Sequence, residues 1–147
     1  MTGSAKQVLR ACLIGLLLAL LLVGAVSGTL LRHIVQILPI VAALVVLQRR
    51  PAWGAYAAFP ILVFWIFIVA LIWLFLLGLS RIANGHYTLI EIVSTFLMAG
   101  FCVIGVTRTI PLGRDLSTLA RAGMFVVFAA MQFAAMWVSF LKPIANR

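Results

Sequence analysis

The sequence predicts an all-α fold, a polytopic bundle of about five transmembrane helices with short connectors. Of its 147 residues, 66% are hydrophobic and 9% are charged, whereas soluble domains contain roughly 45–50% apolar and about 25% charged residues. Apolar runs near the ~20 residues that cross a bilayer as a helix follow one another along the chain. A domain of this size cannot bury so much apolar surface within itself. We therefore expect a single transmembrane domain over 1–147.

The first two spans are expected at 8–27 and 29–48. The first follows Lys6 and Arg10, and its basic start and apolar core also resemble a signal peptide, although we interpret it as an uncleaved anchor. The second is long enough to span if Arg32 snorkels from one end, and a re-entrant segment is the alternative. The turn must be made by residues 27–29, where the two spans meet, and Gly28 can take the positive φ that a tight reversal needs.

The remaining spans are expected at 56–79, 88–107 and 120–141. The first of these is rich in aromatic residues, which indicates lipid-facing or interhelical packing and, as an alternative, a pocket for a quinone, pigment or acyl chain. The connector 108–121 is the one soluble-looking segment. Asp115, two residues after Gly113, is predicted to cap a short interfacial helix; a partner-docking loop is the alternative.

The net charge of +9 comes from basic residues at the ends of apolar runs. They do not form a continuous basic surface of the kind that binds nucleic acid. This placement excludes nucleic acid as the expected partner and favours membrane lipids, including anionic headgroups. Five spans with the N-terminus inside leave seven basic residues on the inner side and four on the outer side. The positive-inside rule then predicts a cytoplasmic N-terminus and an outer C-terminus, and we expect a bacterial inner membrane.

No catalytic motif is present, and the spans contain no acidic residue or lysine near their middle. Ion-coupled transporters usually carry an ionisable group there. With two acidic residues and two histidines in all, hydrolytic chemistry has few groups to use, so we do not expect an enzyme. Cys12 and Cys102 lie inside apolar runs and lack a C-x-x-C spacing, so no metal site through sulfur is predicted.

His33 and His86 are the candidate cofactor ligands. Both are expected near the outer face, with Glu91 close by, and neutral imidazole is a common ligand of haem b and of metals. We otherwise expect no cofactor. Gln36, Arg81, Glu91 and Gln132 are candidate contacts for a ligand or partner. For Gln132, in the middle of the last span, a structural interhelical hydrogen bond is the simpler interpretation.

A structural interpretation covers most of the polar segment 80–93. Asn84-Gly85 is a strong turn dipeptide. Thr88 and Glu91 match a capping box, in which the threonine caps the helix and the glutamate returns to the N–H of the cap. Only Arg81 and His86 are left without a structural reason.

Small residues four apart predict close helix packing, either within the chain or with a partner. The positions are Gly24 with Gly28, Gly54 with Ala58, and Ala130 with Ala134. We therefore expect a hetero- or homo-oligomer, most plainly a non-catalytic subunit or assembly module of a larger membrane complex. An oligomeric protein that transports a small solute or lipid is the first alternative. A redox subunit that holds haem or quinone is the second.

Overall fold

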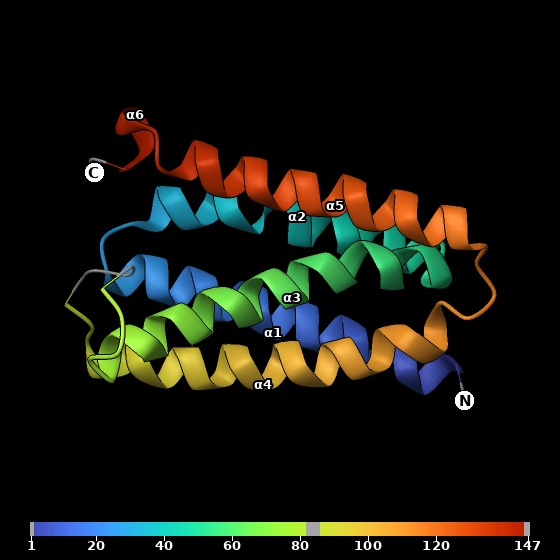
Figure 1. Cartoon of the computed structure of the whole chain (residues 1–147), viewed down its shortest axis with the longest axis horizontal. Coiled ribbons are helices and arrows are strands. Elements are labelled where there is room, and N and C mark those ends of the chain that lie inside the picture. Colours follow the sequence, from blue (N-terminus) through green and yellow to red (C-terminus); the bar gives the residue numbers. More distant parts are fainter. Residues whose placement is uncertain (1, 82–85, 146–147) are drawn as a thin grey trace.

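The computed structural model describes residues 2–81 and 86–145, and it confirms the all-α expectation for them (Figure 1). Five of the helices in this part of the chain are long and apolar enough to cross a membrane, so the protein is a small multi-pass membrane protein. The helices are α1 (Thr2–Val26), α2 (Leu30–Arg49), α3 (Pro51–Leu76), α4 (Leu89–Leu112), α5 (Thr118–Ser139) and the short α6 (Lys142–Ala145).

The long helices extend beyond several of the expected spans. α3 begins at Pro51, because proline suits the first helical position, where no intrahelical N–H bond is needed. α2 is one uninterrupted helix of 20 residues, and it runs along the bundle beside α1 (Figure 1). This is the course of a spanning helix and not of a re-entrant segment. Pro39 lies inside α2 and Pro60 inside α3.

Two helix ends each use a glycine with positive φ. Gly28 has φ 70° in the turn between α1 and α2, as expected. Gly78 has φ 73° after α3, where the N–H of Leu79 donates to the carbonyl of Leu74 and the N–H of Gly78 donates to that of Phe75. These two bonds form a Schellman motif, which satisfies the last carbonyls of the helix.

The connector between α4 and α5 differs from the expectation. Residues 113–116 form turns and a bend, not an interfacial helix. Ser117 is the N-cap of α5, and its Oγ accepts a hydrogen bond from the N–H of Ala120 at 3.3 Å. The predicted capping role of Asp115 is therefore wrong, because a cap must directly precede the first helical residue, here Thr118.

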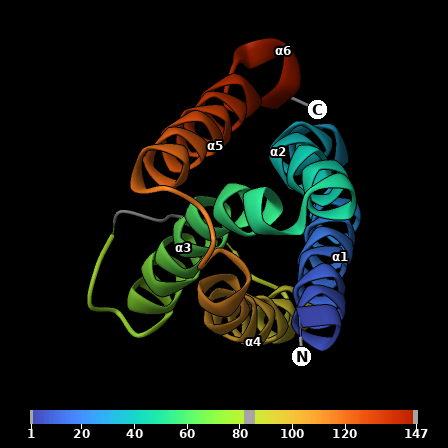
Figure 2. The ribbon, with the colours of Figure 1, turned by 90° about the vertical axis from the view of Figure 1, so that its right-hand side faces the viewer.

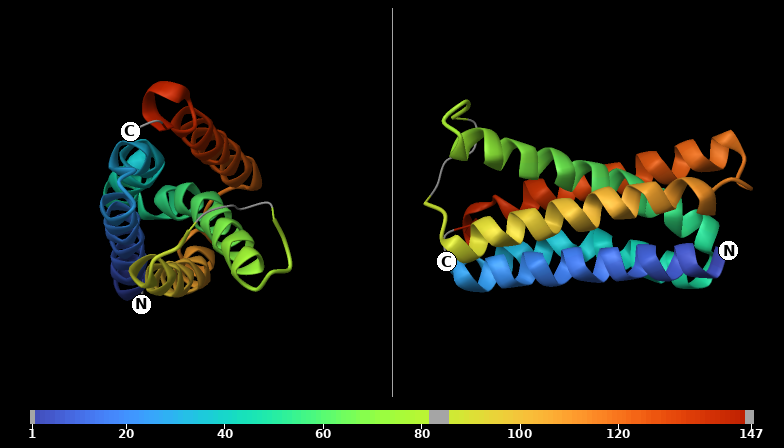
Figure 3. Two further views of the ribbon diagram at one scale, coloured as in Figure 1. Left: turned by 90° about the vertical axis from the view of Figure 1, so that its left-hand side faces the viewer. Right: turned by 90° about the horizontal axis from the view of Figure 1, so that it is seen from below.

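The five long helices run side by side, with the N- and C-termini at opposite ends of the bundle (Figure 1). Seen end-on, α1 and α2 form one side, α4 lies beside the lower part of α1, and α5 stands apart at the top (Figure 2). α3 crosses the bundle obliquely (Figure 3) and contacts α2, α4 and α5. In the described part of the chain, α5 packs only on α2, α3 and α6. It is also the least buried span, since 17% of its apolar stretch is buried within the bundle, against 28–39% for the other four.

Glycines allow the closest approaches between these helices. A Cβ on Gly15 of α1 would lie 2.6 Å from the ring of Phe101 on α4, and one on Gly105 would lie 2.8 Å from Leu62 Cδ1 on α3. A Cβ on Gly54 would meet the backbone of Leu47 where α3 follows α2. Close backbone approach lets helices associate in lipid, where no hydrophobic drive acts between them.

We predict that Gly54→Ala lowers the thermal unfolding midpoint, because the added methyl meets backbone atoms that cannot move aside. Overpacking of this kind costs about 1–3 kcal/mol. Gly100→Ala is the matched control, since nothing lies within 4 Å of a Cβ at that helical position. Alanine has the higher helix propensity by ~0.8–1.0 kcal/mol, so Gly100→Ala should keep or raise the midpoint in detergent. Equal midpoints for the two variants would contradict the packing at Gly54.

Candidate functional site

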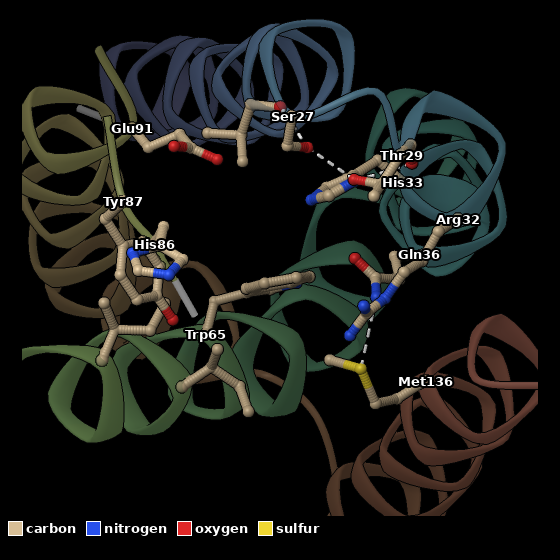
Figure 4. Close-up of a pocket in the computed structure, with 13 residues that line it drawn as sticks. Ser27, Thr29, Arg32, His33, Gln36, Trp65, His86, Tyr87, Glu91 and Met136 are labelled. Atoms are coloured by element: carbon tan, nitrogen blue, oxygen red, sulfur yellow. Dashed lines mark hydrogen bonds between the residues drawn. The ribbon is translucent and has the colours of Figure 1, made fainter. Parts of the chain in front are cut away.

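A polar cavity of about 350 Å³ lies at the end of the bundle that contains the α1–α2 turn. Four long helices and the segment before α4 contribute to it, and α5 adds one side chain. Figure 4 shows polar side chains from these elements around a common space. The lining residues are Val23, Ser27, Thr29, Arg32, His33, Gln36, Trp65, Ile68, Ile72, His86, Tyr87, Glu91 and Met136.

The α1–α2 turn forms one wall through a chain of hydrogen bonds. Ser27 Oγ donates to the carbonyl of Val23 at 2.8 Å and lies 2.6 Å from Thr29 Oγ1. His33 Nδ1 lies 3.1 Å from the carbonyl oxygen of Thr29. A carbonyl only accepts, so Nδ1 of His33 carries the proton in this bond, and Nε2 is the nitrogen left for another contact.

Glu91 occupies the opposite wall, and the predicted capping box is confirmed. The N–H of Thr88 donates to Glu91 Oε2 at 2.6 Å, and the N–H of Glu91 donates to Thr88 Oγ1 at 3.3 Å. Thr88 Oγ1 also donates to the same carboxylate oxygen, at 2.8 Å. All of these bonds to the carboxylate use Oε2, and Figure 4 shows the carboxylate directed toward the cavity.

Arg32 brings a positive charge to the same cavity without pairing with Glu91. Its Cζ lies 3.9 Å from the centroid of the Phe140 ring, and its buried Nε has no hydrogen-bond partner among the described residues.

The charges of Glu91 and Arg32 both act on the pKa of Tyr87, which lines the same cavity. Burial raises the pKa of its hydroxyl and the charge of Glu91 raises it further, whereas Arg32 lowers it. The hydroxyl thus stays protonated at neutral pH and can donate.

Gln36 and Trp65 lie deeper in the cavity. The amide nitrogen of Gln36 donates to Ser139 Oγ at 2.9 Å and to Met136 Sδ at 3.3 Å, which ties α2 to α5. Trp65 is only 3% exposed, and its indole N–H has no acceptor within the described residues. Neither Trp65 nor Arg32 could be singled out from the sequence, because an aromatic span and a snorkelling arginine are both ordinary in membrane helices.

The cavity thus brings together His33, His86, Gln36 and Glu91 of the predicted site residues. Arg81 is exposed and does not line it. Gln132 lies in a separate groove between α3 and α5. The predicted turn at Asn84-Gly85 lies outside the described residues.

The predicted packing residues are distributed differently. A Cβ on Gly24 would lie 2.9 Å from His33, so this glycine admits the imidazole beside α1. Gly28, expected at a packing face, has nothing within 4 Å of a Cβ and serves the turn instead. Ala130 and Ala134 are both exposed on α5.

Two imidazoles and a carboxylate around one space could in principle ligate a metal. No group of three such side chains lies close enough to hold an ion in residues 2–81 and 86–145. Haem b held by His33 and His86 stays a prediction of the sequence, and a Soret band in the purified protein is the observation that would establish it.

Comparisons of the chain with protein-family models, with curated proteins and with solved structures found no match.

Proposed function

We propose that the protein binds the zwitterionic headgroup of a membrane amphiphile, one with an amine and a phosphate, and that it handles lipids of this class. The observation that carries the proposal is the presence of two opposite charges in one cavity without an ion pair between them. Arg32 is held over the Phe140 ring, and Glu91 is held by its own helix cap. A ligand that carries both a positive and a negative charge would pair with Glu91 and with Arg32 at the same time.

The low dielectric of the bilayer makes an unpaired charge in this cavity costly. An isolated charge in such surroundings is costly unless it is paired or hydrogen-bonded. Glu91 is 7% exposed and receives its bonds on Oε2, so Oε1 can accept from an ammonium group. Arg32 has an unpartnered Nε and can donate to phosphate oxygens, for which the guanidinium fork is well suited.

Further donors lie in the same cavity. The indole N–H of Trp65 lacks an acceptor, and the Tyr87 hydroxyl is kept protonated. Both can donate to phosphate oxygens. Ile68 and Ile72 add apolar walls on α3, which suits the start of an acyl chain. Ligand sites commonly combine such apolar walls with a few convergent polar groups.

We predict that Arg32→Gln weakens binding of phosphatidylethanolamine about tenfold or more, because a hydrogen bond to a charged group contributes ~1.5–3 kcal/mol. Glu91→Gln should remove the preference for phosphatidylethanolamine over phosphatidylglycerol. Glutamine can also close a capping box, so this variant should fold normally. Native mass spectrometry of the protein with each lipid measures both effects.

Arg81→Gln is the matched control, since it removes the same charge at the same end of the bundle but outside the cavity. It should bind lipid as the wild type does. Free phosphoethanolamine tests whether a soluble headgroup suffices. Equal losses for Arg32→Gln and Arg81→Gln would indicate general charge attraction and would overturn the proposal.

We also propose that the cavity end faces the outside of a bacterial inner membrane and that the N-terminus is cytoplasmic. The imbalance of basic residues supports this orientation. The basic residues at the N-terminal end are Lys6, Arg10, Arg49, Arg50, Arg108, Arg114 and Arg121, and those at the other end of the described chain are Arg32, Arg81 and Lys142.

Orientation can be measured with an impermeant thiol reagent on intact cells after Cys12 and Cys102, both buried, have been replaced by alanine. We predict that Leu79→Cys reacts from outside, because Leu79 is 73% exposed at the cavity end. Leu119→Cys, 83% exposed at the other end, should react only after the cells are opened. The reverse pattern would reverse the topology.

A second candidate function, an assembly module of a larger membrane complex, is favoured by α5. Its outer face exposes Gly123, Ala130 and Ala134, and nothing lies within 4 Å of a Cβ on Gly123. Small residues at such spacing let a second helix approach closely. We propose that a transmembrane helix of another subunit packs there.

We predict that the double variant Ala130→Leu with Ala134→Leu dissociates this assembly without unfolding the monomer, because the added side chains keep the backbones apart. Native mass spectrometry after mild extraction measures the complex. Ala70→Leu, on an exposed position of α3, should leave it intact. A wild-type protein that is already monomeric would contradict the assembly role.

A further inference from the structure

A second, apolar groove lies between α3 and α5, apart from the polar cavity. Its volume is about 310 Å³, within the range of small-molecule sites, roughly 300–1,000 Å³. Four phenylalanines dominate its lining, which comprises Pro60, Val63, Phe64, Phe67, Phe125, Ala129, Gln132 and Phe133. Only Gln132 brings a polar side chain.

Gln132 is the anomaly of this groove. Its side chain is 1% exposed, and both its amide nitrogen and its amide oxygen lack a hydrogen-bond partner within the described residues. An amide in hydrocarbon surroundings loses its bonds to water and must recover them from a partner. The interhelical hydrogen bond expected from the sequence is therefore not formed by this side chain, although Gln36, on α2, forms one.

The rings around Gln132 indicate the shape of a ligand. Phe64 of α3 and Phe133 of α5 meet edge to face with centroids 5.2 Å apart. Phe67 and Phe133 are 59% and 65% exposed, so the groove opens sideways toward lipid and not toward water. Aromatic side chains favour stacked or edge-on contact with a flat ring. These walls favour a ligand that is lipid-soluble and carries a flat ring.

We propose that this groove binds a lipid-soluble ring compound of the quinone class, whose carbonyl accepts a hydrogen bond from the amide nitrogen of Gln132. The proposal is independent of lipid binding in the polar cavity, because the two sites share no lining residue. The ring lies among the phenylalanines, and an apolar tail extends into the bilayer. The reduced form, with hydroxyl groups, can donate to the amide oxygen, so Gln132 suits both forms.

The test uses decylbenzoquinone and, as the matched compound without carbonyls, decylbenzene. Decylbenzoquinone should raise the thermal unfolding midpoint of the full-length protein in detergent, since a ligand that binds only the folded state stabilises it. Decylbenzene should raise it much less. Equal shifts with both compounds would show that the groove takes any apolar chain, and they would overturn the proposal.

The decisive variant is Gln132→Met, which keeps the side-chain length but removes the amide. We expect its affinity for decylbenzoquinone, measured by titration calorimetry, to fall about tenfold. Its ligand-free midpoint should equal or exceed that of the wild type, because an unpartnered buried amide is lost. Gln7→Met, the same change at an exposed position, should alter neither quantity.

Two results would overturn the proposal. The first is a lower ligand-free midpoint for Gln132→Met, which would show that the amide has partners within the folded protein. The second is a dimeric wild type that becomes monomeric in Gln132→Met, which would show that a second copy satisfies the amide. Failure of lipid binding in the Arg32 and Glu91 variants would leave the quinone result unaffected.

Discussion

Hydrocarbon offers no hydrogen bonds, and this constraint organises the whole molecule. The chain is helical in its spans because only a helix satisfies its own backbone there. Hydroxyl side chains inside α4 donate back to their own helix, as Ser94 does to the carbonyl of Ile90 at 2.7 Å. Trp73 on α3 donates to Thr95 on α4 at 2.9 Å. In such a molecule, an unsatisfied polar atom marks a place where something else belongs.

Arg32, Trp65 and Gln132 stand out by this measure among the described residues. A fourth side chain, Arg121, also has an unpartnered Nε, but its guanidinium donates through Nη2 to a backbone carbonyl outside both sites. Arg32 and Trp65 face one cavity, and Gln132 faces another groove. The two sites differ in the hydrogen-bonding groups that they offer to a ligand. Arg32 and Trp65 offer only donors, beside the carboxylate of Glu91, whereas Gln132 offers one donor and one acceptor in apolar surroundings. Charge separation characterises the first site, and flat aromatic walls characterise the second.

Local features of this fold could be predicted from the sequence, and tertiary ones could not. The capping box of Thr88 and Glu91 depends on three-residue spacing, and the turn at Gly28 on a single residue type, so both were predicted. Ser117 and Asp115 are both good caps, and composition alone did not choose between them. The cavity depends on which helices become neighbours. A hydropathy pattern shared by all five spans contains no such information, so the roles of Arg32 and Trp65 were missed.

Helix packing was also hard to predict, because the sequence does not show which helices become neighbours. Gly15 and Gly105 admit Phe101 and Leu62 from other helices. Although Gly15 stands four residues from an alanine on either side, neither glycine belongs to the small-residue pairs that we predicted. Gly24 does, but the side chain that it admits is His33. A glycine in a span predicts that something approaches closely, and only the tertiary structure shows what does.

The position of α5 at the edge of the bundle has a consequence for how the protein is made. A ribosome releases the N-terminal part of a chain first, so α1 to α4 can pack against one another before α5 enters the membrane. α5 then adds Met136 to the wall of the polar cavity and Gln132 to the groove. Both sites are therefore completed by the last of these five helices to be synthesised. The bond from Gln36 to Ser139 that fastens it forms at the end of assembly.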